Sequence, residues 1–160
     1  MALGIDEIKK IIPHRAPFLL IDEFAVRVWG CDMDFENPER TAIVELEPGV
    51  RAVGKKNVSM KDEYLKGHFP GNPVMPGVLM LEAMAQVGAV IILSVEENKG
   101  KTAFFGGMDK VKFRRKVIPG DVLCMECEVI KQKGPIGIAK ATAKVGDELA
   151  VSAEMTVVLG

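Results

Sequence analysis

One imidazole and one carboxylate stand out as residues that could act together, His68 and Glu82. A neutral imidazole titrates near physiological pH and is a common general base. Glu82 lies within an apolar run, where a carboxylate is costly to bury unless it is paired or protonated. A base and an acid at one site suit proton abstraction next to a carbonyl. The alternatives are an ordinary loop histidine and an acid favoured by the helix dipole, whose effect fades beyond the first turn.

Both residues belong to one stretch, residues 67–94, in which a loop leads into a helix. Prolines and glycines crowd residues 67–77 and indicate tight turns. The following run, Val78–Val95, predicts a helix that is buried on most sides, because nearly all of its side chains are apolar. Its polar side chains are Glu82, Gln86 and Ser94.

The start of this helix supplies a third chemical element. Pro76 stands where its missing N–H costs nothing, and backbone N–H groups near Gly77 and Val78 point out of the helix. Such groups stabilise negative charge that develops on an oxygen. Gln86 lies one turn beyond Glu82 on the same face and is a candidate to orient it, with plain core packing as the alternative.

The rest of the chain predicts strands arranged around this helix. A short amphipathic helix is expected over residues 6–12, and residues 14–22 are expected to form a turn that leads into a short apolar strand. Further strands are expected at residues 24–32, 41–46, 50–59, 102–113, 122–131, 138–145 and 148–159. The pattern indicates an α+β fold in which a curved antiparallel sheet wraps one long apolar helix, with a second subunit able to cover what the sheet leaves open.

Composition limits the classes of function. The 160 residues suffice for one domain with its own core, and we assign residues 1–160 to a single domain. A formal net charge of −1 argues against a general nucleic-acid binder. The N-terminus shows no signal peptide, and a membrane span over Val78–Val95 is disfavoured by the cost of Glu82 and Gln86 in lipid.

Cysteine and histidine content argues against a disulfide framework and a metal site. Cys31, Cys124 and Cys127 are too few for a framework and indicate a reducing compartment such as the cytoplasm. Cys124 and Cys127 match C-x-x-C, but strand residues three apart point to opposite faces. The two histidines lie in separate turns, and we expect His14 to be a structural hydrogen-bonding residue. No metal is therefore expected.

The motifs around the central helix resemble those of a known enzyme family. The chain is similar to the FabZ-type (3R)-hydroxyacyl-[acyl-carrier-protein] dehydratases in GHFPG at residues 67–71, MPGVL at 75–79 and EAMAQ at 82–86. Further similar blocks are PHRAPFLLID at residues 13–22, KNVS at 56–59 and FRRKVIPGD at 113–121. The resemblance covers roughly residues 5–159. Within it, residues 24–55 form a longer segment than usual, without a motif to match.

The resemblance implies a hot-dog fold and a defined reaction. The reaction is reversible dehydration of a (3R)-3-hydroxyacyl thioester to the trans-2-enoyl thioester in type II fatty acid biosynthesis, without a metal or redox cofactor. His68 would remove the α-proton, Glu82 would help protonate the departing 3-hydroxyl, and the Gly77 N–H would bind the thioester carbonyl. The resemblance also implies a homodimer, commonly assembled into a hexameric trimer of dimers, in which His68 of one subunit faces Glu82 of the other.

Delivery of the substrate in this family implies two further sets of residues. An acidic acyl carrier protein bears the substrate, and a basic cluster would steer it. The candidate cluster is Lys112, Arg114, Arg115 and Lys116, with a solvated strand edge as the alternative. Phe104 and Phe105 are candidates to line an apolar tunnel for the acyl chain, with ordinary core positions as the alternative.

Three other functions stay open from the sequence. A hot-dog thioesterase shares the fold and the substrate class but releases a free thiol. A dehydratase that also isomerises usually has Asp where this chain has Glu82, so the glutamate favours the plain dehydratase. A non-enzymatic acyl-binding or scaffold protein would bind without turnover. The GHFP and PHR motifs favour the dehydratase over the thioesterase and the binding protein.

Overall fold

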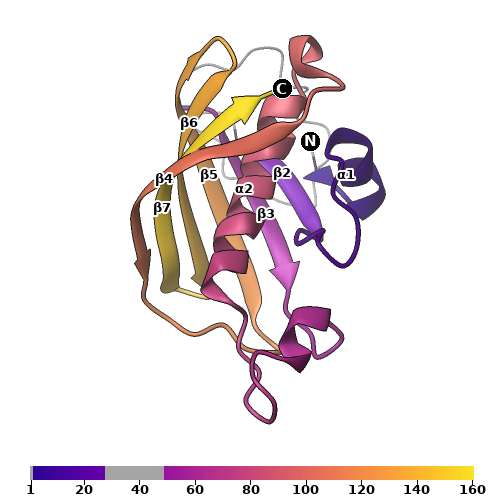
Figure 1. Ribbon diagram of the computed structural model, residues 1–160, viewed down its shortest axis with the longest axis vertical. Helices are drawn as coiled ribbons and strands as arrows, with labels where there is room; N and C mark the ends of the chain where they lie inside the picture. Colours follow the sequence, from indigo (N-terminus) through magenta and orange to yellow (C-terminus); the bar gives the residue numbers. More distant parts are fainter. Residues whose placement is uncertain (1, 28–48) are drawn as a thin grey trace.

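The computed structural model describes residues 2–27 and 49–160 (Figure 1). Its helices are α1 (Ile5–Ile11), the short 3₁₀ helices η1 (Glu63–Lys66) and η2 (Glu96–Asn98), and the long α2 (Gly77–Leu93). Its strands are β1 (Ala2–Leu3), β2 (Glu23–Arg27), β3 (Arg51–Asn57), β4 (Ala103–Phe113), β5 (Val122–Lys133), β6 (Ile136–Val145) and β7 (Glu148–Leu159).

The described strands form one antiparallel sheet in the order β1-β2-β3-β5-β6-β7-β4. Figure 1 shows this sheet curving around α2, with α1 beyond β2 and β4 crossing in front of the helix. The α+β prediction of a curved sheet wrapped around one long helix is confirmed. Strand β4 lies at an edge of the sheet, so that one side of its backbone has no neighbouring strand within the described residues.

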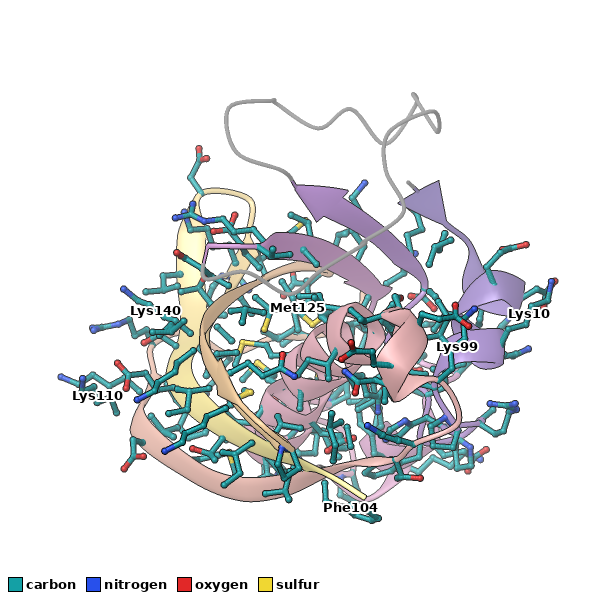
Figure 2. All side chains as sticks on the ribbon, turned by 90° about the horizontal axis from the view of Figure 1, so that it is seen from above. Lys10, Lys99, Phe104, Lys110, Met125 and Lys140 are labelled. Atoms are coloured by element: carbon teal, nitrogen blue, oxygen red, sulfur yellow. The ribbon has the colours of Figure 1, made fainter. Side chains whose placement is uncertain are left out.

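The core lies between α2 and the concave face of the sheet. Helix α2 is buried along most of its length from Met80 to Leu93. Figure 2 shows sulfur atoms gathered between helix and sheet, with Met125 of β5 among them. Gly54 of β3 permits the close approach of the two layers, because an added Cβ would collide with a methyl group of Val87 on α2. A buried helix of this kind derives its stability from packing more than from helix propensity.

One predicted strand is wrong. Residues 14–22 form turns and bends, and strand structure begins only at Glu23. The backbone N–H groups of this run find other partners: Leu19 N donates to the carbonyl of Arg15 at 2.9 Å, and Leu20 N donates to Gln86 Oε1 at 2.8 Å. The side chains at positions 20 and 21 are nevertheless fully buried, so their apolar pattern reports core packing.

Among the other sequence predictions, some are confirmed and some lie outside the described residues. The strand expected at residues 24–32 is observed as β2 up to Arg27, and its remaining residues, like the strand expected at residues 41–46, lie outside the described residues. The two cysteines of β5 point to opposite faces as predicted, with Cys124 partly exposed and Cys127 buried. Burial raises the pKa of the Cys127 thiol to about 12. No helix of the described part is long and apolar enough to cross a membrane.

The contact at Gly54 yields a stability prediction. Gly54→Ala should lower the free energy of unfolding by about 1–3 kcal/mol, because the new methyl group must push Val87 and α2 away from β3. Gly107→Ala on β4 is the matched control, since no atom lies within 4 Å of its added Cβ. Urea denaturation of both variants measures the difference. Equal stability of the two variants would contradict the close approach of β3 and α2.

Candidate active site

His68 is held by the loop that precedes α2. Its Nδ1 lies 2.7 Å from the carbonyl oxygen of Val74, and its ring stacks on Phe69 with centroids 4.0 Å apart. A carbonyl oxygen only accepts hydrogen bonds, so Nδ1 must carry the hydrogen and Nε2 of the neutral ring keeps a lone pair. The loop is tied to the segment that follows β4, because Met75 N donates to Val117 O at 2.8 Å. This arrangement leaves Nε2 available as a base.

A cavity of about 600 Å³ joins His68 to the start of α2. Gly77 lines this cavity, and its N–H belongs to the first helical turn, where no intrahelical carbonyl is available. A Cβ at position 77 would lie 2.7 Å from Cε1 of Phe113, so a side chain here requires the phenyl ring to move. The predicted base and the predicted oxyanion donor are therefore neighbours in one chain.

Glu82 lines a second cavity of about 230 Å³ on another part of α2. Its Oε1 accepts a hydrogen bond of 3.0 Å from Gln86 Nε2 and lies 3.3 Å from Nε2 of His14. Its Oε2 receives no hydrogen bond from the described residues. His68 does not line this cavity, so the structure does not bring the base and the acid together within one chain.

Gln86 is more than a packing residue. Its side chain is 1% exposed, and its amide makes three hydrogen bonds. Nε2 donates to Glu82 Oε1 at 3.0 Å and to Phe18 O at 2.8 Å, and Oε1 accepts from Leu20 N at 2.8 Å. The structure thus places Gln86 where it can orient Glu82.

The two candidate tunnel residues are not core residues. Phe104 and Phe105 are 56% and 42% exposed, and both line the cavity of Glu82. Figure 2 shows Phe104 at the outer rim of the molecule, away from the sulfur-rich core. An exposed pair of phenyl groups beside a carboxylate is available for an apolar ligand or a second chain.

The basic cluster divides into two kinds of residue. Arg114 and Lys116 are exposed and line the cavity of His68, and Lys112 is exposed on β4. Arg115 is committed elsewhere: its Nη1 lies 2.8 Å from Asp121 Oδ2 and its Nε lies 3.0 Å from Glu148 Oε2. Of the four predicted docking residues, Lys112, Arg114 and Lys116 have exposed charged groups that a partner can contact.

His14 is the site residue that sequence reasoning missed. It was expected to be structural, yet its ring contacts Glu82 and lines the same cavity. His14 and Glu82 are 68 positions apart in the sequence. Their contact depends on how residues 14–22 pack against α2. The available signal was the PHR motif itself, which belongs to one of the blocks of family resemblance.

Comparison with known proteins decides the family. Residues 40–154 match the family described as "FabA-like domain". The chain is 54% identical over 160 residues, all of this chain and 99% of the relative, to the "3-hydroxyacyl-[acyl-carrier-protein] dehydratase FabZ" of Clostridium novyi (strain NT). A relative of the same name from Clostridium botulinum (strain Kyoto / Type A2) is 52% identical, with 99% of this chain and 96% of that protein covered. The chain belongs to the FabZ family.

The FabZ assignment also bears on residues 24–55. The match to the Clostridium novyi FabZ spans the full length of both proteins, so a segment without a recognisable motif is no peculiarity of this chain.

Solved structures show the hot-dog fold. The dehydratase heterocomplex ApeI:P from Xenorhabdus doucetiae has a TM-score of 0.68 at 17% identity, covering 96% of this chain and 90% of that chain. The fluoroacetyl-CoA thioesterase FlK has a TM-score of 0.61 at 15% identity, covering 72% and 89%. These likenesses concern the fold alone, and they agree with the hot-dog fold that the sequence resemblance implied.

The buried amide of Gln86 yields the second prediction. Gln86→Met keeps the length of the side chain but leaves the buried Leu20 N and the carbonyl of Phe18 without their partner. The free energy of unfolding should fall by about 2–3 kcal/mol. The control is Ser94→Ala, which removes one hydroxyl bond to Val90 O at the other end of α2 and should cost about 1 kcal/mol. Chemical denaturation compares them, and a Gln86→Met loss no larger than the control would contradict the bridging role.

Proposed function

We propose that this FabZ-family chain is a hydro-lyase that reversibly dehydrates (3R)-3-hydroxyacyl-[acyl-carrier-protein] to trans-2-enoyl-[acyl-carrier-protein] in type II fatty acid biosynthesis. The observation that carries the proposal is the His68 ring, which is fixed by its Nδ1 contact with Val74 O and lines the same cavity as the first turn of α2. Family membership supplies the substrate class.

The proposed reaction is an elimination that moves two protons. The Gly77 N–H binds the thioester carbonyl and stabilises the negative charge that develops there. His68 Nε2 removes the proton from C2, and the electrons of that C–H bond form the C2=C3 double bond. The C3–O bond breaks as Glu82 protonates the hydroxyl, and water leaves. The hydrogens and the oxygen balance as one water molecule, and the step requires no redox cofactor or metal.

We propose further that each active site is shared between two copies of the chain. His68 and Glu82 line separate cavities in one chain, so a second copy is needed to bring a base to an acid. Edge strand β4 exposes large apolar side chains that a second copy would cover: Phe104, Phe105, Met108 and Phe113, each 42–56% exposed. The family resemblance supports assembly of three such dimers into a hexamer.

Substrate delivery follows from the two cavities. The exposed charges of Lys112, Arg114 and Lys116 suit an acidic carrier protein that docks near the mouth of the His68 cavity. Phe104 and Phe105 offer the acyl chain an apolar wall beside Glu82. We also propose a cytoplasmic location, which the free thiols of Cys124 and Cys127 and the relatives named as dehydratases of a carrier-protein substrate support.

A direct turnover assay tests the function. Purified chain is mixed with a trans-2-enoyl thioester, and loss of the conjugated enoyl absorbance is followed beside release of free thiol. Hydration without thiol release is expected, and His68→Ala and Glu82→Gln should each lower kcat by about 10²–10⁴-fold. Thiol release would move the assignment to a thioesterase, and a 3-enoyl product would add isomerase activity. Binding without any turnover would favour an acyl-binding protein.

Mixing the two dead variants tests the shared site. His68→Ala and Glu82→Gln chains are unfolded together, refolded and assayed against each variant refolded alone. A mixed dimer has one site with both mutations and one site with neither, so random pairing should restore about a quarter of wild-type activity. If each chain carried a complete site of its own, the mixture would stay inactive.

Charge removal tests the docking surface. Arg114→Ala with Lys116→Ala should raise KM for carrier-bound substrate roughly fivefold and leave KM for a small thioester unchanged. The matched control removes two exposed lysines of β6, Lys140→Ala with Lys144→Ala. Figure 2 shows Lys140 projecting from the far side of the sheet. Equal changes of KM on both substrates would contradict carrier docking at this site.

A further inference from the structure

One ring nitrogen of His14 contacts Glu82, and the other ring nitrogen is buried. Nε2 lies 3.3 Å from Glu82 Oε1, and the two side chains are 22% and 16% exposed. The ring lies nearly parallel to that of Phe18, with centroids 6.3 Å apart and planes 15° apart. Nδ1 is buried and has no hydrogen-bond partner among the described residues. The His14 ring therefore lies with Nε2 beside the Glu82 carboxylate and with Nδ1 enclosed by the protein.

We propose that His14 is a positioning residue that donates its Nε2 hydrogen to Glu82 Oε1 and so reserves Oε2 for proton transfer to the substrate. The inference rests on the proposed dehydratase function. Gln86 Nε2 donates to the same oxygen at 3.0 Å. With His14 as a second donor beside Gln86, Oε1 would be the hydrogen-bond acceptor of the carboxyl group and its plane would be fixed. The exchangeable proton then resides on Oε2, which no described residue engages.

The position of the hydrogen on His14 follows from its surroundings. With the hydrogen on Nδ1, the Nε2 lone pair would face the lone pairs of Glu82 Oε1, and a buried N–H would lack an acceptor. With the hydrogen on Nε2, both faults disappear. Between the two tautomers, the contact with Glu82 thus favours the one with its hydrogen on Nε2.

The two histidines of the protein consequently hold opposite tautomers. His68 carries its hydrogen on Nδ1, because Val74 O accepts it, and presents a lone pair at Nε2. His14 carries its hydrogen on Nε2 and presents a donor. One imidazole is arranged to take a proton from the substrate, and the other is arranged to hold the carboxyl group that gives one.

Nitrogen NMR of the full chain tests the tautomers without reference to activity. The protein has two histidines, so ¹⁵N-histidine labelling of untagged protein gives two ring patterns, and His14→Phe assigns them by loss of one. An Nε2–H pattern for His14 and an Nδ1–H pattern for His68 are expected. Glu82→Leu removes the acceptor of the Nε2–H, so it should shift the Nε2 signal of His14 and leave His68 unchanged. An Nδ1–H pattern for His14 in the wild type would overturn the proposal.

Kinetics then separate positioning from plain structure. His14→Phe keeps an aromatic ring beside Phe18 but removes the donor, so kcat should fall about tenfold with KM within twofold and Tm unchanged. His14→Gln, which restores an N–H, should recover part of kcat. In a Glu82→Gln background the loss from His14→Phe should vanish, because the group it positions is gone. The same fractional loss in that background, or full activity of His14→Phe, would overturn the proposal.

The two experiments fail independently. A wild-type protein with the expected tautomers but without hydration activity would refute the dehydratase function and leave the contact between His14 and Glu82 standing. An active wild-type protein whose His14→Phe variant is equally fast would refute the positioning role and leave the function intact.

Discussion

The single amide of Gln86 ties together parts of the chain that are distant in sequence. It receives Leu20 N–H, donates to Phe18 O and donates to Glu82 Oε1, all from a position that is 1% exposed. Turning the amide over would set Oε1 against two oxygens and Nε2 against an N–H, which replaces three attractions by three repulsions. The orientation of Gln86 is therefore dictated by its partners, and the direction of Glu82 follows from it.

The hydrogen bonds of Gln86 explain why residues 18–22 do not form a strand. The continuous apolar run in residues 18–21 predicts one, but Gln86 engages the backbone N–H and C=O groups that a strand neighbour would need. The segment instead closes over α2 on a side that the sheet does not cover. Ile12, Leu20 and Ile21 are each at most 1% exposed, as an apolar helix needs on every side. A hydrophobic pattern indicates that side chains are buried. The groups that hydrogen-bond to the backbone decide whether the segment forms a strand.

The fold was largely predictable because its signals are local and periodic. The apolar run that became α2 and the alternating strands of the second half needed no knowledge of distant contacts. The site was predictable only to the level of the motif. The four basic residues at positions 112 and 114–116 look equivalent in sequence. Arg115 differs from the others because it forms ion pairs with Asp121 and Glu148. The contact between His14 and Glu82 likewise exists only after the N-terminal segment has docked.

The two catalytic groups depend on different parts of the chain, and α2 holds those parts in register. The half with His68 rests on the segment after β4, through Met75 N on Val117 O and the packing of Phe113 on Gly77. The half with Glu82 rests on the N-terminal segment. Gly77 and Glu82 lie little more than one turn apart on α2, so one helix carries a part of each of two proposed shared sites. Groups that are fixed before the substrate binds need no reorganisation during the reaction. The proposed mechanism therefore depends on the segment that carries His14 as much as on the loop that carries His68.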